Sequence, residues 1–512
     1  MTHPRTADVL IVGGGLMGST IARLVREARP GARIVMVDAG KAIGDTPGLH
    51  LHDVPDPDLW ERYNERVASG IQGMYTGSGT APRPAHDGRR PRPGMFRPGM
   101  VRAGEFGEDA EAMPAAAIAW NAGGMGVHWT AATPWPAGTE VFDGGDPHGW
   151  AADLRTAQRV LGVHPSPIGP TEPGRVVLDV LRKHLAGVGP SDRAPQPMPM
   201  AVQPATQGPT PRTGPSLVFP PIAAGGDDRF ALYTETLATS LLVDGGQVRG
   251  AHVRQVADGT ERDVLAHTVV VCADALRTPQ LLFASGIRPW ALGRHLNEHA
   301  FITGRVLLDL DRFGIDLATL PRPRPGEFCT DSLWIPQNGP DQPFHGQIMN
   351  TTYVTGTGHP LAHSVGLSLY SPVESRPDNR LVFSRTETDA AGMPRIGIEF
   401  TYSRTDLDLI DRALAQVQEL AELFGPFDPA TERALLPPGS SLHLTGTVRV
   451  GRHDDGTSVA DPAGRVWGFE NLYVAGTGAV PTPVVANATL TGAVTAVHTA
   501  RAVARRTTAP AH

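Results

Sequence analysis

A glycine-rich segment near the start of the chain has the spacing of a dinucleotide-binding turn. Gly13, Gly15 and Gly18 fit the pattern GxGxxG, directly after an apolar run over 8–12 and before a helical pattern over 19–29. The first glycine permits the tight turn, the second lets a pyrophosphate approach the backbone, and the third lets the helix pack on the strand. Amide groups at the helix N-terminus would then face the phosphate charge.

An acidic residue follows at the distance that this motif requires. Asp38 lies 20 residues after Gly18, at the end of a second apolar run over 32–37. A carboxylate in that place can hydrogen-bond the hydroxyls of a ribose. The pattern therefore predicts a bound FAD or NAD, and the motif alone does not distinguish the two.

A second turn that could face a ligand is predicted in the C-terminal part. Residues 471–476 have the character of a buried strand that ends in Gly476, and a helix start follows at 487–493. Backbone amides in such a turn can lie against the ring of a cofactor. We therefore expect Gly476 to contribute to the same dinucleotide site.

The elements around these motifs predict an α/β chain. Residues 231–266 indicate a β-meander with turns at 244–246 and 258–259, and a buried strand over 267–272 and a helix from 276 to 284 follow. This part resembles a nucleotide-binding domain, and the same character returns in the C-terminal stretch with the strand at 471–476. The prediction is a Rossmann-like domain assembled from separate stretches of the chain.

The middle of the chain predicts a second, α+β domain. Several alternating or apolar stretches between 300 and 402 indicate a largely antiparallel sheet. Helical patterns occur at 150–163 and 172–188, and a clear amphipathic helix is expected over 406–424, with apolar residues at helical spacing: Leu407, Ile410, Leu414, Val417, Leu420 and Leu423. A sheet backed by helices would form the substrate domain.

Composition excludes several classes of function. The chain has 512 residues, enough for about two to four domains, and a net charge of −7. This charge gives no basic surface for nucleic acid or an anionic membrane, and no apolar run reaches about 18 residues. No signal peptide is visible, so we expect a cytoplasmic location. The two cysteines, Cys272 and Cys329, either stay reduced or form one bridge, and no HExxH pattern occurs, so no metal site is predicted.

Several segments are similar to the glucose-methanol-choline oxidoreductase family. The helix start at 487–493 resembles that family's N-P-T-L-T segment, with Ala488 in place of the proline, and 269–287 and 293–299 resemble its internal signature. Within the family, GGMGVHWTAATP at 123–134 is similar to the pyranose oxidases and bacterial glycoside 3-oxidases. The resemblance covers most of the chain, except 70–104 and 190–220. It implies an FAD-dependent enzyme that oxidises the CH–OH group of a sugar or glycoside.

The resemblance also implies a catalytic pair. His443 matches the family's catalytic histidine, and Asn487 matches the asparagine paired with it. A neutral imidazole is a suitable base for an alcohol near pH 7, while a bound flavin takes hydride from the same carbon. By residue type alone, His443 could equally be a buried histidine with its hydrogen bonds satisfied, and Asn487 could be a helix N-cap.

Further contacts with flavin and sugar follow from the same likeness. His128 matches a position that bonds covalently to flavin in some relatives, and otherwise it would only contact the ring. Trp129 and Thr130 would lie beside the flavin, with Thr130 also near the substrate. Gln347 would bind a sugar hydroxyl. Thr351 stands where the family has an acid, which argues against plain glucose 2-oxidation and leaves room for a bulkier glycoside.

These interpretations give a domain plan and a function. The prediction is oxidation at C2 or C3 of a pyranose, with O2 or a quinone as the final electron acceptor; the alternatives are a lyase with structural FAD, another alcohol oxidase or dehydrogenase, and a non-catalytic flavin-binding protein. The sequence does not predict the oligomeric state. Each part of the plan is a set of ranges: the FAD-binding domain 1–50, 105–140, 225–300 and 440–512, the substrate domain 141–224 and 301–439, and a lid or long loop 51–104.

Overall fold

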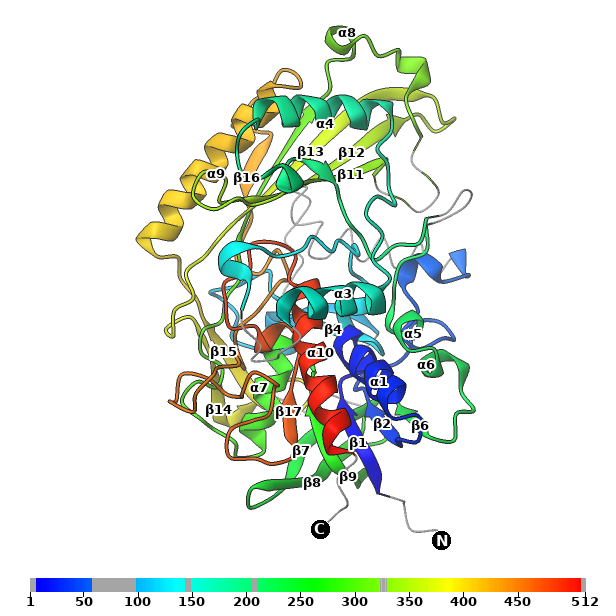
Figure 1. The fold of residues 1–512 in the computed structure, drawn as a ribbon, viewed down its shortest axis with the longest axis vertical. Coiled ribbons are helices and arrows are strands. Elements are labelled where there is room, and N and C mark those ends of the chain that lie inside the picture. Colours follow the sequence, from blue (N-terminus) through cyan, green and yellow to red (C-terminus); the bar gives the residue numbers. More distant parts are fainter. Residues whose placement is uncertain are drawn as a thin grey trace.

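The computed structural model describes residues 6–57, 98–142, 149–204, 210–322, 324, 327 and 329–507. Two large sheets lie at opposite ends of its long axis (Figure 1). Most of the lid or loop region expected at 51–104 lies outside the described residues, except for a short 3₁₀ turn at Leu51–Asp53 and the strand β3 (Gly99–Arg102), which pairs with β4 (Ala117–Trp120).

The first sheet begins with the β-α-β unit that the sequence predicts. The strands β1 (Ala7–Val12) and β2 (Ile34–Val37) pair in parallel and are joined by α1 (Leu16–Ala28). Parallel pairing continues on both sides in the order β6-β2-β1-β9-β17. The three added strands are β6 (Phe230–Tyr233), β9 (Glu261–Val271) and β17 (Leu472–Val474). The predicted Rossmann-like core is confirmed.

Helices cover both faces of this parallel sheet, which explains why β1 is apolar at successive positions. Val9 and Ile11 pack in the same cluster as residues of α1 and of α10 (Thr489–Arg506). Leu10 and Val12 point to the other face and pack in the cluster that includes α7 (Asp274–Ala284). The sheet is therefore buried between the helix pair α1–α10 and the helix α7.

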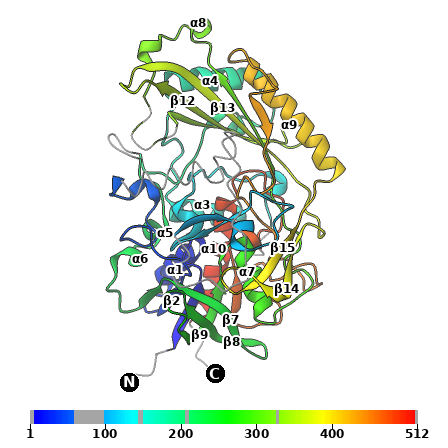
Figure 2. The same ribbon diagram turned by 180° about the vertical axis from the view of Figure 1, so that it is seen from behind.

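The first half of β9 also closes the predicted meander. β7 (Thr236–Asp244) pairs antiparallel with β8 (Gln247–Gln255), and β8 pairs antiparallel with β9. The turns between them contain Gly245 and Gly259 at φ +58° and +76°, a region in which glycine has no Cβ clash. Figure 2 shows the three strands together at the base of the molecule.

The second sheet is antiparallel throughout, as expected. Its order is β16-β10-β13-β12-β11-β5, with bounds Arg433–Leu435, Ala300–Leu307, Pro360–Ser371, His345–Val354, Asp331–Ile335 and Gln196–Pro197. Two helices, α4 (Glu172–His184) and α9 (Arg404–Glu422), lie on its outer side (Figure 1). The side chain of Ser403 caps α9, and Ile410, Val417 and Leu420 are its buried stripe.

Two stretches expected in this sheet form a separate hairpin. β14 (Arg380–Thr388) and β15 (Pro394–Glu399) form a two-stranded sheet, and this hairpin contacts α7 beside the first sheet (Figure 2). Alternation marks a half-buried strand but does not say which partner it pairs with. The expectation of one sheet for all four stretches between 300 and 402 is therefore wrong in this part.

Three other helices lie beside the helices of the first sheet. α3 (Gly149–Leu161) packs against α10, and α5 (Pro215–Val218) packs against α1 and is followed by α6 (Pro221–Ala224). The sequence assigned all three to the substrate domain, within 141–224. Their contacts favour moving them to the dinucleotide domain, and the other boundaries of the domain plan stay a prediction. The short helix α8 (Leu310–Phe313) follows β10.

Candidate active site

The glycine turn after β1 is closed by backbone contacts that no larger residue allows. Gly13 has φ +108°, and a Cβ there would lie 2.5 Å from the carbonyl oxygen of Cys272. A Cβ on Gly18 would lie 2.1 Å from the carbonyl oxygen of Gly13, so Gly18 permits the close packing of α1 on the turn. Gly15 is the N-terminal cap position of α1. The three predicted glycines therefore occupy the positions that the motif requires.

Asp38 connects this turn to two other segments. Its carboxylate accepts hydrogen bonds from the amides of Gly14 (3.1 Å), Gly40 (2.9 Å) and Gly123 (3.2 Å). Burial raises the pKa of Asp38, and these amides oppose that increase. The residue thus holds the glycine turn against the segment that begins the 123–134 motif.

A single cavity is lined by six of the twelve predicted site residues. Its lining includes Gly13, Gly15, Asp38, Trp129 and His443, and also Gly476, which follows β17 with φ +104°. Gly18 lies behind this lining, as its packing role requires. The empty space, part of it open to solvent, is about 1640 Å³, which is sufficient for a dinucleotide. The glycine cradle, the carboxylate and the volume together fit an FAD molecule.

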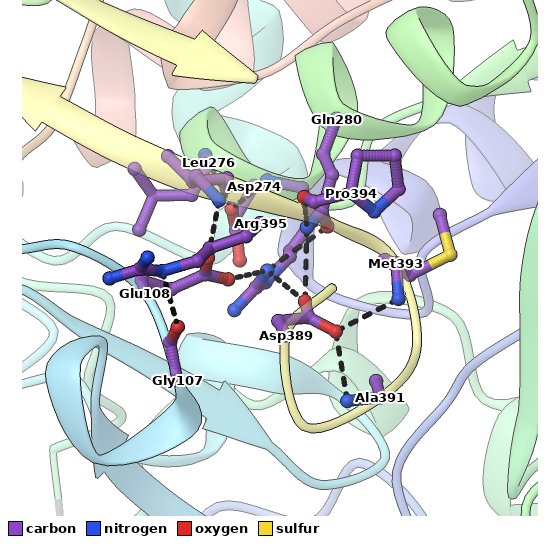
Figure 3. Close-up of polar contacts among 12 residues, drawn as sticks. Gly107, Glu108, Asp274, Leu276, Gln280, Asp389, Ala391, Met393, Pro394 and Arg395 are labelled. Atoms are coloured by element: carbon purple, nitrogen blue, oxygen red, sulfur yellow. Dashed lines mark hydrogen bonds and ion pairs between the residues drawn. The ribbon is translucent and has the colours of Figure 1, made fainter. Parts of the chain in front are cut away.

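A buried ion-pair cluster lines another part of the cavity wall. The Nη1 atom of Arg277 on α7 lies 2.5 Å from Glu108 and 3.0 Å from Asp389, and Gln280 also donates to Asp389. Figure 3 shows Glu108, Gln280 and Asp389 converging from three separate parts of the chain. Burial raises the pKa of Glu108 to about 7. No sequence pattern marked this cluster, because its members are far apart along the chain.

His443 and Asn487 lie side by side, as the resemblance implies. The Nδ2 atom of Asn487 lies 3.4 Å from Nε2 of His443, a long hydrogen-bond distance. Burial lowers the pKa of His443 to about 4, so its imidazole is neutral at pH 7. The N-terminal cap of α10 is Ala488, without a side-chain cap bond, so Asn487 is not the helix cap that its residue type suggested.

Other ring side chains surround this pair, and the sequence did not single them out. The Nδ1 atom of His443 lies 2.9 Å from Nε2 of His299, which precedes β10. The ring of Tyr370 lies 4.4 Å from that of His299 and stacks on His345 at 5.3 Å with an interplanar angle of 8°. Trp334 donates from Nε1 to Nδ1 of His345 at 2.9 Å. His345 and Tyr370 are single rings on strands, and His299 lies just before one, so no catalytic spacing marked them.

Sheet register brings the second sheet's residues to this place. His345 lies directly opposite Tyr370 across β12 and β13, and Trp334 lies opposite Gln347 across β11 and β12. Gln347 is buried, and its Oε1 accepts a hydrogen bond of 3.4 Å from the hydroxyl of Tyr370. Gln347 is thus joined to the ring cluster around His443.

Thr351 lies further along β12, away from that cluster. It is four residues after Gln347, which corresponds to about 13 Å along a strand, and it pairs with Ser364. The structure therefore does not bring Thr351 to His443, and the substrate contact expected for it stays a prediction.

A glutamate supports the loop that carries His443. The carboxylate of Glu298 accepts hydrogen bonds from the amide of Gly439, the amide of Ser441 (3.1 Å) and the hydroxyl of Ser441 (2.6 Å). The adjacent Leu442 has φ +60°, an uncommon conformation for leucine. Burial raises the pKa of Glu298 to about 7, and its hydrogen bonds oppose that increase.

The segment 128–130 is held by its own set of contacts. Nε2 of His128 lies 2.7 Å from Oδ1 of the buried Asn121, and Trp129 donates from Nε1 to the carbonyl of Thr213 at 2.8 Å. Burial lowers the pKa of His128 to about 3. Trp129 lines the cavity, and Thr130 follows it without being part of the lining.

The described part of the chain contains no group of three or more His, Cys, Asp or Glu side chains that could hold a metal ion. Two histidine pairs, His295–His299 and His359–His363, do have the i,i+4 spacing of helical metal ligands, but neither pair lies in a helix. Cys272 and Cys329 are both free and buried, so the alternative of a bridge between them is wrong. Among the described residues, no helix is long and apolar enough to span a membrane.

The sequence is similar to known oxidoreductases over nearly its whole length. Family models for GMC oxidoreductases match residues 227–301 and 375–496. A C-glycoside 3-oxidase from Microbacterium trichothecenolyticum is 37% identical over 99% of this chain and 98% of its own length, and one from Arthrobacter globiformis is 36% identical over 99% and 96%. A pyranose 2-oxidase from Tricholoma matsutake is 28% identical over 97% and 93%.

Solved structures agree at the level of the fold. A pyridoxine 4-oxidase from Mesorbium loti superposes with a TM-score of 0.62 at 17% identity, covering 98% of this chain and 99% of its own. A formate oxidase from Aspergillus oryzae superposes with a TM-score of 0.66 at 15% identity, covering 99% of both chains. The chain has the glycine turn and two sheets, and its relatives are similar over nearly their whole length. It therefore belongs to the GMC oxidoreductase family.

Proposed function

We propose that this protein oxidises a secondary hydroxyl of the pyranose ring of a glycoside, with FAD as its cofactor. The observation that carries the proposal is the neutral imidazole of His443, beside Asn487 and on the wall of the dinucleotide cavity. The relatives named C-glycoside 3-oxidase, at 37% and 36% identity, favour C3 over C2 as the carbon attacked and a C-glycoside as the substrate.

The glycine turn and Asp38 hold the cofactor in this proposal. Gly13 and Gly15 would leave room for the pyrophosphate, Gly18 keeps α1 close to the turn, Asp38 would face the ribose, and Gly476 would line the same cofactor site. Bound FAD supplies the group that accepts a hydride from the carbon bearing the hydroxyl. The final acceptor of the two electrons and two protons would be O2 or a quinone, which would be reduced to H2O2 or a hydroquinone.

His443 is the base. Its Nε2 atom takes the proton of the substrate hydroxyl, and the electron pair of the broken O–H bond stays on the oxygen that becomes the carbonyl. The Nδ2 group of Asn487, 3.4 Å from that nitrogen, donates a hydrogen bond to the same hydroxyl oxygen and fixes its direction. Gln347 and the neighbouring rings of Tyr370 and His345 form the sugar side of the site.

We propose that His128 contacts FAD and that its Nε2 atom forms no covalent bond with the flavin. The Nδ2 atom of Asn121 donates to the carbonyl of Gly124 at 3.1 Å, so its Oδ1 atom must accept, and Nε2 of His128 must carry a proton. A bond from Nε2 to the flavin would leave the oxygen of a buried asparagine without its donor. Acid precipitation of the protein should therefore release the yellow cofactor into solution, and retention in the pellet would contradict this.

The decisive experiment is anaerobic mixing of the holoenzyme with monosaccharides, O-glycosides and C-glycosides. Loss of the visible flavin absorbance with a glycoside, and a keto group at C3 in the NMR spectrum of the product, is the expected result. A keto group at C2 would correct the position. If no sugar or glycoside reduces the flavin, the oxidation is wrong, and a lyase with structural FAD becomes the better explanation. The cytoplasmic location stays a prediction.

A further inference from the structure

A chain of hydrogen bonds leads from a backbone carbonyl to the ring of His443. Nδ1 of His299 lies 3.1 Å from the carbonyl oxygen of Val484, and Nε2 of His299 lies 2.9 Å from Nδ1 of His443. His299 is 2% exposed and its ring packs against Tyr370 at 4.4 Å. The chain therefore lies in the protein interior, behind the face of His443 that meets Asn487.

The carbonyl determines where the protons of both rings lie. A carbonyl oxygen can only accept, so Nδ1 of His299 must carry a proton. Burial and the nearby imidazoles of His443 and His345 lower the pKa of His299 well below its usual value, so the ring is neutral and its Nε2 has a free lone pair. That lone pair can only accept, so the proton between the two rings belongs to Nδ1 of His443.

We propose that His299 is a positioning residue that keeps the proton of neutral His443 on Nδ1 and so leaves Nε2 free to accept the proton of the substrate hydroxyl. The role rests on the proposed function of His443 as the base. In a serine protease triad a carboxylate does the same for its histidine, and the wrong tautomer there costs about 10⁴ in rate. Here a second imidazole, oriented by the carbonyl of Val484, takes that place.

His299 also assists the charged form of the base. When Nε2 of His443 gains the substrate proton, Nδ1–H of the imidazolium donates to the lone pair of His299, and charge-assisted hydrogen bonds are roughly twice as strong as neutral ones. The groups around the two rings are otherwise without full charge: Tyr370, His345 and Asn487 face them, and the carboxylate of Glu298 points instead at Gly439 and Ser441.

Two variants separate this role from simple packing. His299→Leu keeps the bulk but removes the acceptor, and His299→Gln offers an amide that can donate to Val484 and accept from His443. We expect the rate constant of flavin reduction by a glycoside to fall about 10²-fold or more in His299→Leu and to recover in His299→Gln. His363→Leu is the matched control, because His363 is a buried histidine bonded to Thr352 and should leave the rate unchanged.

The tautomer itself gives a second readout, which does not require turnover. In holoenzyme labelled with ¹⁵N-histidine, the signals of His443 are those lost in His443→Gln, and they should show a neutral ring protonated at Nδ1. In His299→Leu they should move toward the form protonated at Nε2, with the same FAD content as the wild type.

Three results would overturn the inference: a wild-type His443 already protonated at Nε2, a His299→Leu variant that reduces flavin at the wild-type rate, or a His299→Gln variant as slow as His299→Leu. If no glycoside reduces the wild-type flavin, the proposed function fails, and the NMR tautomer still decides the role of His299.

Discussion

At the Asp38 end of the cavity, backbone groups make most of the polar contacts, whereas at the His443 end side chains from widely separated segments make them. Asp38 accepts the amides of Gly14, Gly40 and Gly123, and glycines close the turn. His443 contacts His299 and Asn487 through ring and amide atoms, and the second sheet adds further rings. The first end depends on backbone shape and the second on placement of individual side chains.

This difference predicts how each end responds to substitution. A glycine cradle fails when a side chain fills it, so damage there should affect folding and cofactor retention together. A proton-accepting ring can be removed from its cluster while the fold persists, so damage at the other end should affect chemistry with little loss of cofactor.

The largest effect is expected at His443. His443→Ala should lower the rate constant of flavin reduction by a glycoside about 10²- to 10⁴-fold, because the substrate proton loses its acceptor. Stopped-flow absorbance measures the rate, and FAD content should match the wild type. His359→Ala is the control, since His359 is exposed and lies in the connection between β12 and β13. A His443→Ala enzyme that keeps its rate would remove the proposed base.

The second effect concerns the glycine turn. Gly18→Ala places a Cβ 2.1 Å from the carbonyl oxygen of Gly13, and the resulting overpacking should lower the free energy of unfolding by about 1–3 kcal/mol and reduce FAD retention. Gly31→Ala is the matched control, because a Cβ there meets nothing within 4 Å. Thermal unfolding and the flavin-to-protein absorbance ratio measure both effects. Equal behaviour of the two variants would show that the turn tolerates a side chain.

A smaller effect follows from Glu298, whose pKa is raised to about 7 in the folded protein from an ordinary value near 4.5. Folding favours the protonated form of Glu298. The contribution of this carboxyl to the free energy of unfolding is therefore complete below about pH 4.5 and is lost as the pH rises toward 7. Glu298→Gln should flatten this part of the pH dependence of unfolding, by on the order of 1–2 kcal/mol between pH 5 and 8. Glu108 shifts in the same direction, so a slope remains in the variant. An unchanged slope would contradict the assignment.

The smallest effect is a shift in the pH at which the rate of flavin reduction begins to fall. The pKa of His443 is lowered to about 4 by burial, so the ring stays neutral down to about that pH. Flavin reduction at limiting glycoside should therefore be insensitive to pH between about 5 and 7 and decline only below about 4, whereas an ordinary histidine would give a limb near about 6.5. A limb at the ordinary value would mean that His443 is more solvated than its burial indicates.

The sequence predicted the local parts of the fold well. The β1-α1-β2 unit, the meander of β7, β8 and β9, and the amphipathic helix α9 follow from apolar periodicity, turn glycines and capping residues that lie close together in the chain. Strand partners were predicted less well. The hairpin of β14 and β15 is separate from the sheet to which alternation alone assigned it, because alternation marks a face and not a neighbour.

The site divides along the same line. Gly13, Gly18 and Asp38 were identified from their spacing, because the steric requirements of a dinucleotide-binding turn fall on residues that are close together in the sequence. His443 and Asn487 required the likeness to a family, since nothing in their own surroundings in the chain marks them. His299, His345 and Tyr370 were missed, because each is a single ring on or beside a strand.

By itself, the sequence determined the backbone cradle at the Asp38 end: the absence of a Cβ at fixed positions, after a buried strand and before a helix, permits one kind of turn. Only the tertiary structure decided the proton positions at the His443 end. The direction in which Val484 presents its carbonyl, and the opposition of His345 and Tyr370 across two strands, depend on sheet register and on the packing of distant segments. Hydrogen-bond direction between imidazoles is set by such neighbours, and no local pattern of residues encodes it.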